Sequence, residues 1–203
     1  MTASSRILGL TIMLMGLAWS ARSDPLPDGI GLFTDLAGTV DRTLATPGAL
    51  FTVHLLLINP EVCHLTQTFG WSWGCRIEVT DNLHVLDWGS PSGCNSLAPP
   101  EFLVTCQGAF PNGSMGVLLT TLLVEVTDSE PGQFYLQEFH FGGVALPPTL
   151  TLWNGISAPC VVWLQATSGS WDQPVFLVNP RNTGTVAART WGGLKILYRL
   201  EDP

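Results

Sequence analysis

The feature that most constrains the fold of this chain is the length of its apolar runs. They are strand-sized, rich in β-branched and aromatic residues, and separated by turns of Gly, Pro, Asn and Asp. Apolar residues at helical spacing are almost absent from this part of the sequence. The runs span residues 30–34, 51–58, 73–79, 83–88, 102–105, 117–126, 133–139, 150–153, 160–165 and 175–178. About ten short strands predict an all-β fold of two antiparallel sheets packed face to face, an Ig-like β-sandwich.

Polarity within the runs indicates which strands are central. In residues 75–79, Arg76 and Glu78 alternate with three apolar residues, as in a strand with one face in water. Residues 51–58 and 117–126 are apolar almost throughout, which is typical of strands covered on both faces.

The first 23 residues are typical of a signal peptide. Arg6 precedes an uncharged, mostly apolar run over residues 7–19, and small residues precede the expected cleavage after Ser23. A helix over that run would reach about 20 Å, short of the ~30 Å hydrocarbon core of a bilayer. We therefore expect a secreted, periplasmic or cell-surface protein with no membrane span after cleavage, and a mature net charge of −10.

The remaining chain is long enough for one domain, so we expect a β-sandwich over residues 24–185. Residues 186–203 read as a C-terminal helical tail, with Thr190 as its N-cap and Lys195 near its negative end. This tail would either cover one edge of the sandwich or serve as an exposed element for attachment, sorting or partner capture.

Charge and motifs exclude several classes of function. A sequence pI of 4.7 with only eight Lys and Arg argues against nucleic acid as a partner. No phosphate-binding or dinucleotide-binding glycine motif is present, so we expect no cofactor. Paired Cys or His ligands at zinc spacing are also absent, and the N-terminal aspartates lack a calcium-loop pattern. We therefore expect no metal.

Five cysteines in an exported chain predict disulfides. Cys63 and Cys75 are twelve positions apart, as are Cys94 and Cys106, so two local bridges are favoured, each worth ~3 kcal/mol. A bridge between Cys75 and Cys106 on neighbouring strands is an alternative that spacing leaves open. Cys160 is then left as a buried inert thiol, or as the site of an intermolecular bridge, or as a reactive site.

A catalytic site is the alternative to a binding function. Ser114 lacks the strand-to-helix elbow of a hydrolase nucleophile. Glu125 and Glu138 could form the carboxylate pair of a glycosidase, or could simply face solvent from neighbouring strands. A secreted hydrolase acting on polysaccharide or ester is therefore the second hypothesis.

Tryptophan is abundant, with seven residues after position 23. Trp71 and Trp73 are two residues apart, so in a strand they share one face, which is either the core or an aromatic binding platform. Trp171 lies between turn-forming residues and is the best single candidate for an exposed contact. Such a surface would contact carbohydrate or a partner protein.

Asn112 begins an Asn-Gly-Ser sequence, the acceptor pattern for N-glycosylation. Because Pro111 precedes it and Gly113 follows it, the same residues also form a turn signal.

The order of these runs resembles that of cohesin-like β-sandwiches. The resemblance is carried by residues 52–60, by a Trp-bearing strand ending at residue 80, by residues 81–89 and by the long apolar run 116–126. It covers residues 30–153 and implies a scaffold or docking role through a sheet face. No residue matches a dockerin-contact motif, and the extra cysteines depart from the pattern. The chain ends also resemble those of exported bacterial proteins without an assigned activity.

These observations predict a single secreted β-sandwich that binds a partner, or serves in a surface or matrix, without catalysis. A third hypothesis is an assembly subunit, a homo-oligomer joined through an uncovered sheet edge or through Cys160.

Overall fold

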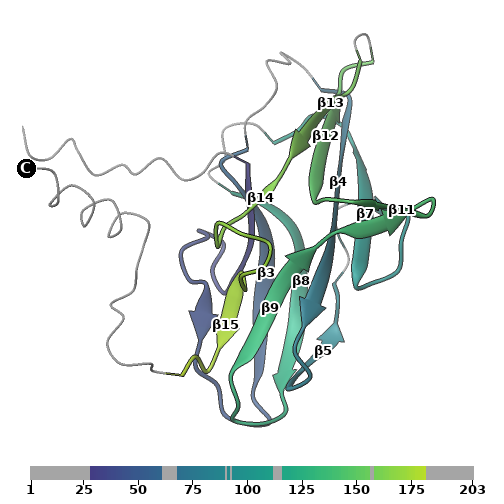
Figure 1. Cartoon of the computed structure of the whole chain (residues 1–203). Helices are drawn as coiled ribbons and strands as arrows, with labels where there is room; N and C mark the ends of the chain where they lie inside the picture. The colour runs from purple at the N-terminus through teal and green to yellow at the C-terminus, as the bar shows by residue number, and fades with distance from the viewer. Residues whose placement is uncertain are drawn as a thin grey trace, which may run out of the picture. The chain divides into compact units, whose positions relative to one another are not determined.

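The computed structural model describes residues 28–60, 68–89, 91, 93–111, 116–155 and 158–181. These residues form strands and connecting loops, and none of them is helical. Accordingly, the described part of the chain contains no helix that could span a membrane. The strands form two main sheets and one separate hairpin (Figure 1). The fold is therefore all-β, as the apolar runs predicted. The signal peptide predicted over residues 1–23 and the helical tail predicted over residues 186–203 lie outside the described residues.

The first sheet has five strands. Its long central pair, β3 and β8, is built from the two almost continuously apolar runs. In order across the sheet, the strands are β14 (Gln165–Ala166), β1 (Gly29–Phe33), β3 (Leu50–Ile58), β8 (Gly116–Val126) and β5 (Leu83–Asp87).

The second sheet has eight strands, and β4 pairs with three of them. On its main path lie β13 (Cys160–Trp163), β12 (Thr149–Trp153), β4 (Gly70–Val79), β9 (Gly132–Gln137), β15 (Phe176–Val178) and β2 (Arg42–Thr43). β7 (Glu101–Gln107) pairs with β4, and β6 (Cys94–Asn95) pairs with β7.

β9 and β12 follow one another along β4. Gln137 at the end of β9 pairs with Arg76, and Thr149 at the start of β12 pairs with Gly74. The intervening residues leave the sheet as a hairpin of β10 (Phe139–Phe141) and β11 (Val144–Leu146). This hairpin stands out beside β7 (Figure 1). The Phe139 ring packs on Gly74, where an added Cβ would lie 2.5 Å from the ring.

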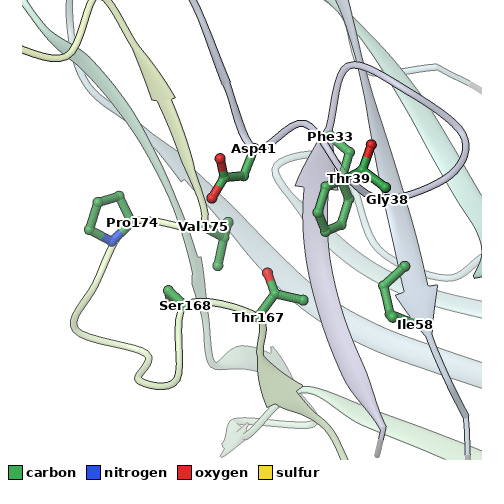
Figure 2. Close-up of a pocket in the computed structure, with 9 residues that line it drawn as sticks. All are labelled: Phe33, Gly38, Thr39, Asp41, Ile58, Thr167, Ser168, Pro174 and Val175. Carbon is green, nitrogen blue, oxygen red and sulfur yellow. The ribbon is translucent and has the colours of Figure 1, made fainter. Parts of the chain in front are cut away.

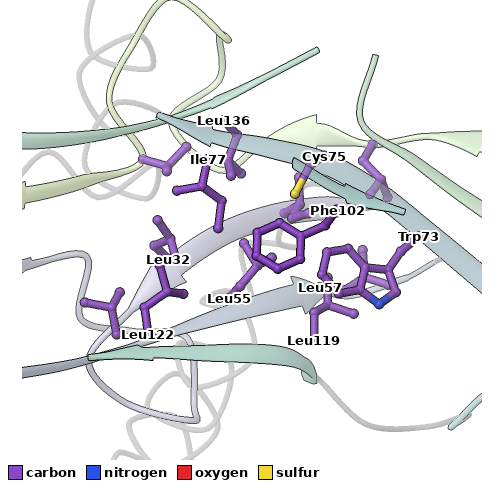
Figure 3. Packing of buried hydrophobic residues seen from close by; sticks show 14 of the residues in the cluster. Leu32, Leu55, Leu57, Trp73, Cys75, Ile77, Phe102, Leu119, Leu122 and Leu136 are labelled. Atoms are coloured by element: carbon purple, nitrogen blue, oxygen red, sulfur yellow. The ribbon is translucent and has the colours of Figure 1, made fainter. Parts of the chain in front are cut away.

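The hydrophobic core lies between the two sheets. Leu32, Leu55 and Leu122 of the first sheet face Trp73 and Phe102 of the second, and all five are almost completely buried (Figure 3). Burying side chains of this size contributes about 1.5–3 kcal/mol each, so this contact between the sheets is the main source of stability.

The predicted runs match the strands closely, but the prediction of purely antiparallel sheets is wrong. β14 runs parallel to β1, and β15 runs parallel to β2. Both β14 and β2 are two-residue segments that bond to a neighbouring strand through the backbone. Hydrophobic patterning carries no information about such short pairings, so the sequence could not predict their direction.

The structure contradicts the disulfide predictions for Cys75. Cys75 is a thiol buried in the core, where burial raises its pKa well above the ordinary value. Its cross-strand partner on β7 is Phe102, and Cys106 pairs with Trp71. Cys75 and Cys106 are thus four positions out of register, about 13 Å along the strand, which is too far for a bridge. Cys63 lies outside the described residues.

The prediction of a buried thiol at Cys160 is also wrong. Cys160 is disulfide-bonded. It begins β13, an edge strand, and is only half-buried. The sequence Cys-Val-Val-Trp suggested a buried thiol because an edge strand and a central strand of this composition look alike.

Candidate binding face

The outer face of the eight-stranded sheet carries side chains from β4, β7, β9, β12 and β13. The hairpin of β10 and β11 divides this face, because Phe139 covers Gly74 at the middle of β4. On one side of the hairpin the outward residues are uncharged, and the other side, here called the charged half, includes Arg76 and Glu78.

The uncharged half has two large apolar side chains that are unusually exposed. Trp163 and Val161, both on β13, are 59% and 49% exposed. Their cross-strand partners on β12 are Thr149 and Thr151. The two strands thus display an indole and a branched aliphatic side chain beside hydroxyl groups, with no charge between them.

Two further aromatic residues extend this half. The indole of Trp153 lies across Gly70, where an added Cβ would be 2.3 Å from the ring. Phe69 directly precedes β4, and its side chain is 61% exposed and lies near Gly155. We call Trp163, Val161, Trp153 and Phe69 the aromatic corner. Exposed apolar patches are typical of interaction sites.

The charged half contains a hollow of about 360 Å³ beneath the hairpin. Trp171 lines it and is half-buried, and its backbone carbonyl accepts a hydrogen bond from Gln137. Trp171, which the sequence suggested as an exposed contact, therefore lines a hollow on the surface and also packs against the core. The other residues of this hollow are Arg76, Glu78, Gln137, Glu138, His140, Pro147, Pro148 and Asp172.

A hydrogen bond connects the hairpin to the charged half. His140 Nδ1 lies 2.9 Å from Glu101 Oε1 on β7. The hydrogen bond from His140 is the largest influence on Glu101 and lowers the pKa of its carboxyl group. Arg76 lies 3.8 Å from Glu78, so the positive group in this hollow is already paired with an acid.

A second hollow of about 210 Å³ lies between the loop after β1 and the loop after β14. Figure 2 shows Asp41 and Thr167 beside the apolar side chains of Phe33 and Val175. The loop after β1 is held by Asp35, whose carboxylate accepts hydrogen bonds from Thr39 and Val40. Burial raises the pKa of Asp35, but these hydrogen bonds outweigh it and keep the pKa below its ordinary value.

The proposed platform of Trp71 and Trp73 is wrong, because both residues belong to the core. They share one face of β4, as their spacing predicted, and that face points toward the other sheet. Trp71 packs edge-on against Phe110 with ring centroids 5.2 Å apart, and Trp73 stacks on Phe102 at 5.6 Å. The spacing was interpreted correctly, but only packing identifies which face is buried.

The two carboxylates of the hydrolase hypothesis do not meet. Glu125 lies on β8 of the five-stranded sheet, 4.0 Å from His84. Glu138 follows β9 in the other sheet and lines the hollow beneath the hairpin. Among the described residues, no three His, Cys, Asp or Glu side chains are grouped as metal ligands would be. Ser114 and Asn112 lie outside the described residues.

Sequence reasoning missed the aromatic corner. Val161 and Trp163 belong to an apolar run that also fits a buried strand, and their exposure results from the edge position of β13. The only signal in the sequence was the alternation of side chains along a strand. Val162 packs against the core, so Val161 and Trp163 on either side of it point outward.

Comparison with known proteins finds similarity at the level of structure. No protein-family model matches the chain, and no curated protein matches it. A type II cohesin domain from the cellulosome of Acetivibrio cellulolyticus superposes with a TM-score of 0.37 and 11% identity, covering 74% of this chain and 95% of that one. The type II cohesin dyad from the adaptor ScaA scaffoldin of the same organism gives 0.40 and 10%, covering 76% of this chain and 48% of the dyad.

The second type II cohesin module of that scaffoldin gives a TM-score of 0.37 and 8% identity, with 75% and 96% of the two chains covered. The chain is thus similar in structure to type II cohesin domains, the kind of β-sandwich that the order of its apolar runs also resembles.

Proposed function

We propose that this protein is a non-catalytic binding module that contacts another protein through the outer face of its eight-stranded sheet. The observation that carries the proposal is the aromatic corner, where Trp163 and Val161 are about half exposed on a rigid strand. Tryptophan provides a large contact area at low entropic cost, and it is enriched among residues that dominate binding energy.

A protein surface fits this corner better than a carbohydrate. The corner combines an aliphatic side chain with aromatic ones, and its flanking residues, such as Thr149 and Thr151, are short and uncharged. Sugar sites pair aromatic rings with side chains that form several directed hydrogen bonds. The corner instead has the composition of an interface core, in which charged residues are depleted.

The charged half would then form the rim of the interface. Trp171, Glu138 and Asp172 line its hollow, so the partner's rim should be basic there. In this arrangement the hairpin of β10 and β11 projects between the two halves and fixes the orientation of the partner.

The test is capture of cross-linked partners from the natural surroundings of the protein. We expect Trp163→Ala to reduce capture at least tenfold. Leu50→Ala is the matched control, because Leu50 is 57% exposed on the other sheet and should leave capture unchanged. Circular dichroism would verify that both variants fold.

Equal loss in both variants, or retention in Trp163→Ala, would reject the aromatic corner as the contact surface. Affinity electrophoresis in polysaccharide gels tests the alternative. Retardation that depends on Trp163 would assign the face to carbohydrate instead.

A further inference from the structure

Cys94 and Cys106 lie on neighbouring strands at the edge of the eight-stranded sheet, one residue out of register. β6 pairs Cys94 with Thr105, the residue immediately before Cys106. Because successive side chains of a strand point to opposite faces, Cys94 is exposed on the outer face while Cys106 is buried beneath it. In this register the two sulfur atoms are on opposite sides of the strand pair.

The position opposite Cys106 belongs to Gly93. A Cβ added to Gly93 would lie 2.9 Å from the Sγ atom of Cys106. Across a disulfide, each Cβ lies about 3 Å from the far sulfur, as follows from an S–S bond of about 2.05 Å. A cysteine placed at this position would therefore have the geometry of a disulfide with Cys106.

We propose that β6 slips by one residue, which brings Cys94 to the place of Gly93 and joins it to Cys106 in a redox-dependent disulfide. The slip is local, because β6 has two residues and, among the described strands, pairs with β7 alone. A shift of one residue also turns every side chain of the strand to the opposite face, as this bridge requires.

The slip breaks specific contacts. Asn95 Oδ1 accepts hydrogen bonds from the backbone NH groups of Leu97 and Leu103, and both bonds must be exchanged. The carbonyl oxygen of Thr105 lies 2.6 Å from the Cβ position at Gly93, so the edge strand also moves outward slightly. These contacts hold the thiol form in its present register, and the covalent bond provides the opposing free energy.

The chemistry balances with a disulfide-bearing oxidant such as glutathione disulfide. The Cys94 thiolate attacks one glutathione sulfur, which breaks the S–S bond, forms a mixed disulfide and releases one glutathione thiolate. The Cys106 thiolate then attacks the Cys94 sulfur and releases the second glutathione. Two protein thiols are oxidised and one glutathione disulfide is reduced. Cys94 attacks first because it is exposed, whereas burial and the neighbouring Cys94 raise the pKa of Cys106.

Closing this bridge would also change the proposed interface. Cys94 lies in a row of outward residues that continues through Thr105, Ser72 and Thr151 to Val161. The slip withdraws the thiol from the end of this row. Only this consequence rests on the proposed function, because formation of the bridge can be measured without any partner.

In the experiment, the full folded chain is treated with glutathione disulfide and its remaining thiols are blocked by alkylation. The protein is then digested with a glutamate-specific protease. Cleavage after Glu101 separates Cys94 from Cys106, so the bridge appears as residues 79–101 linked to residues 102–125. We expect this linked pair in most molecules and its loss on reduction. In the chain kept reduced, alkylation of the folded protein should label Cys94.

Two variants test the slip itself. Cys94→Ser should prevent the linked peptide pair. The double variant Gly93→Cys with Cys94→Ser presents a thiol opposite Cys106 without any slip, so it should form the bridge at least as fast as the natural chain. The proposal would be overturned if the bridge formed in the double variant alone or in neither protein. It would also be overturned by a stable glutathione adduct on Cys94, or by a dimer linked through Cys94.

Discussion

At the residue scale, the same residue type has opposite roles according to where its strand lies. Trp73 is 1% exposed between the sheets, whereas Trp163 is 59% exposed on an edge strand. The two are equally apolar and both occur in strand-like runs. Their contributions to stability should therefore differ sharply.

We expect Trp73→Ala to lower the free energy of unfolding by about 3–5 kcal/mol, because it leaves a cavity against Phe102. Trp163→Ala should change it by less than about 1 kcal/mol. Urea denaturation followed by circular dichroism measures both changes. Similar losses in the two variants would mean that Trp163 is part of the folded core.

A titration is also predicted for the pair of Glu101 and His140. The pKa of Glu101 is lowered from its ordinary value of 4.5, mainly by the hydrogen bond from His140. A lowered folded-state pKa adds stability above the unfolded value, and this stability is lost as the pH falls through the folded value. We therefore expect the stability advantage of the natural chain over Glu101→Gln to shrink below about pH 4.5.

Thermal unfolding between pH 7 and pH 3 measures this advantage. His140→Ala should remove most of the same pH dependence, because His140 is the largest cause of the shift. If the natural chain and both variants lose stability in parallel, this pair has no part in the acid response.

At the scale of elements, the hairpin of β10 and β11 depends on a glycine in β4. Phe139 anchors the hairpin by packing on Gly74, and Trp153 lies on Gly70 in the same way. Both glycines face outward, so they provide room for aromatic rings without a turn or a left-handed backbone. The close approach of each aromatic ring to the backbone explains why β4 has glycine at these two positions.

Gly74→Ala should destabilise the protein by about 1–3 kcal/mol, because the new Cβ would meet the Phe139 ring at 2.5 Å. Gly116→Ala is the matched control, since the nearest atom to its added Cβ is 3.5 Å away and the change should be nearly neutral. Limited proteolysis at the hairpin tip provides a second measurement. Equal stability of the two variants would show that Phe139 does not need this space.

At the scale of the whole molecule, acidic charge dominates. The described residues contain three arginines, no lysine and twelve aspartates and glutamates. Each arginine already has a neighbouring acid as its partner: Arg42 with Asp41, Arg76 with Glu78 and Arg181 with Glu130. The remaining acids repel one another across the surface.

We therefore expect salt to stabilise the fold. Raising the ionic strength from about 0.01 M to about 0.15 M shortens the Debye length from about 30 Å to about 8 Å, which screens this repulsion. The melting temperature should rise by about 2–4 °C in NaCl. KCl should act equally, because screening depends on ionic strength; a difference between the salts, or a falling melting temperature, would contradict the explanation.

The sequence by itself determined the all-β fold, the position of nearly every long strand and the shared face of Trp71 and Trp73. These follow from local periodicity, which depends only on neighbouring residues. The tertiary structure decided which face is covered, which strands lie at an edge, and how β4 aligns with β7. Those facts depend on contacts between distant segments, and for that reason the aromatic corner, the thiol at Cys75 and the register of Cys94 against Cys106 could not be predicted from spacing.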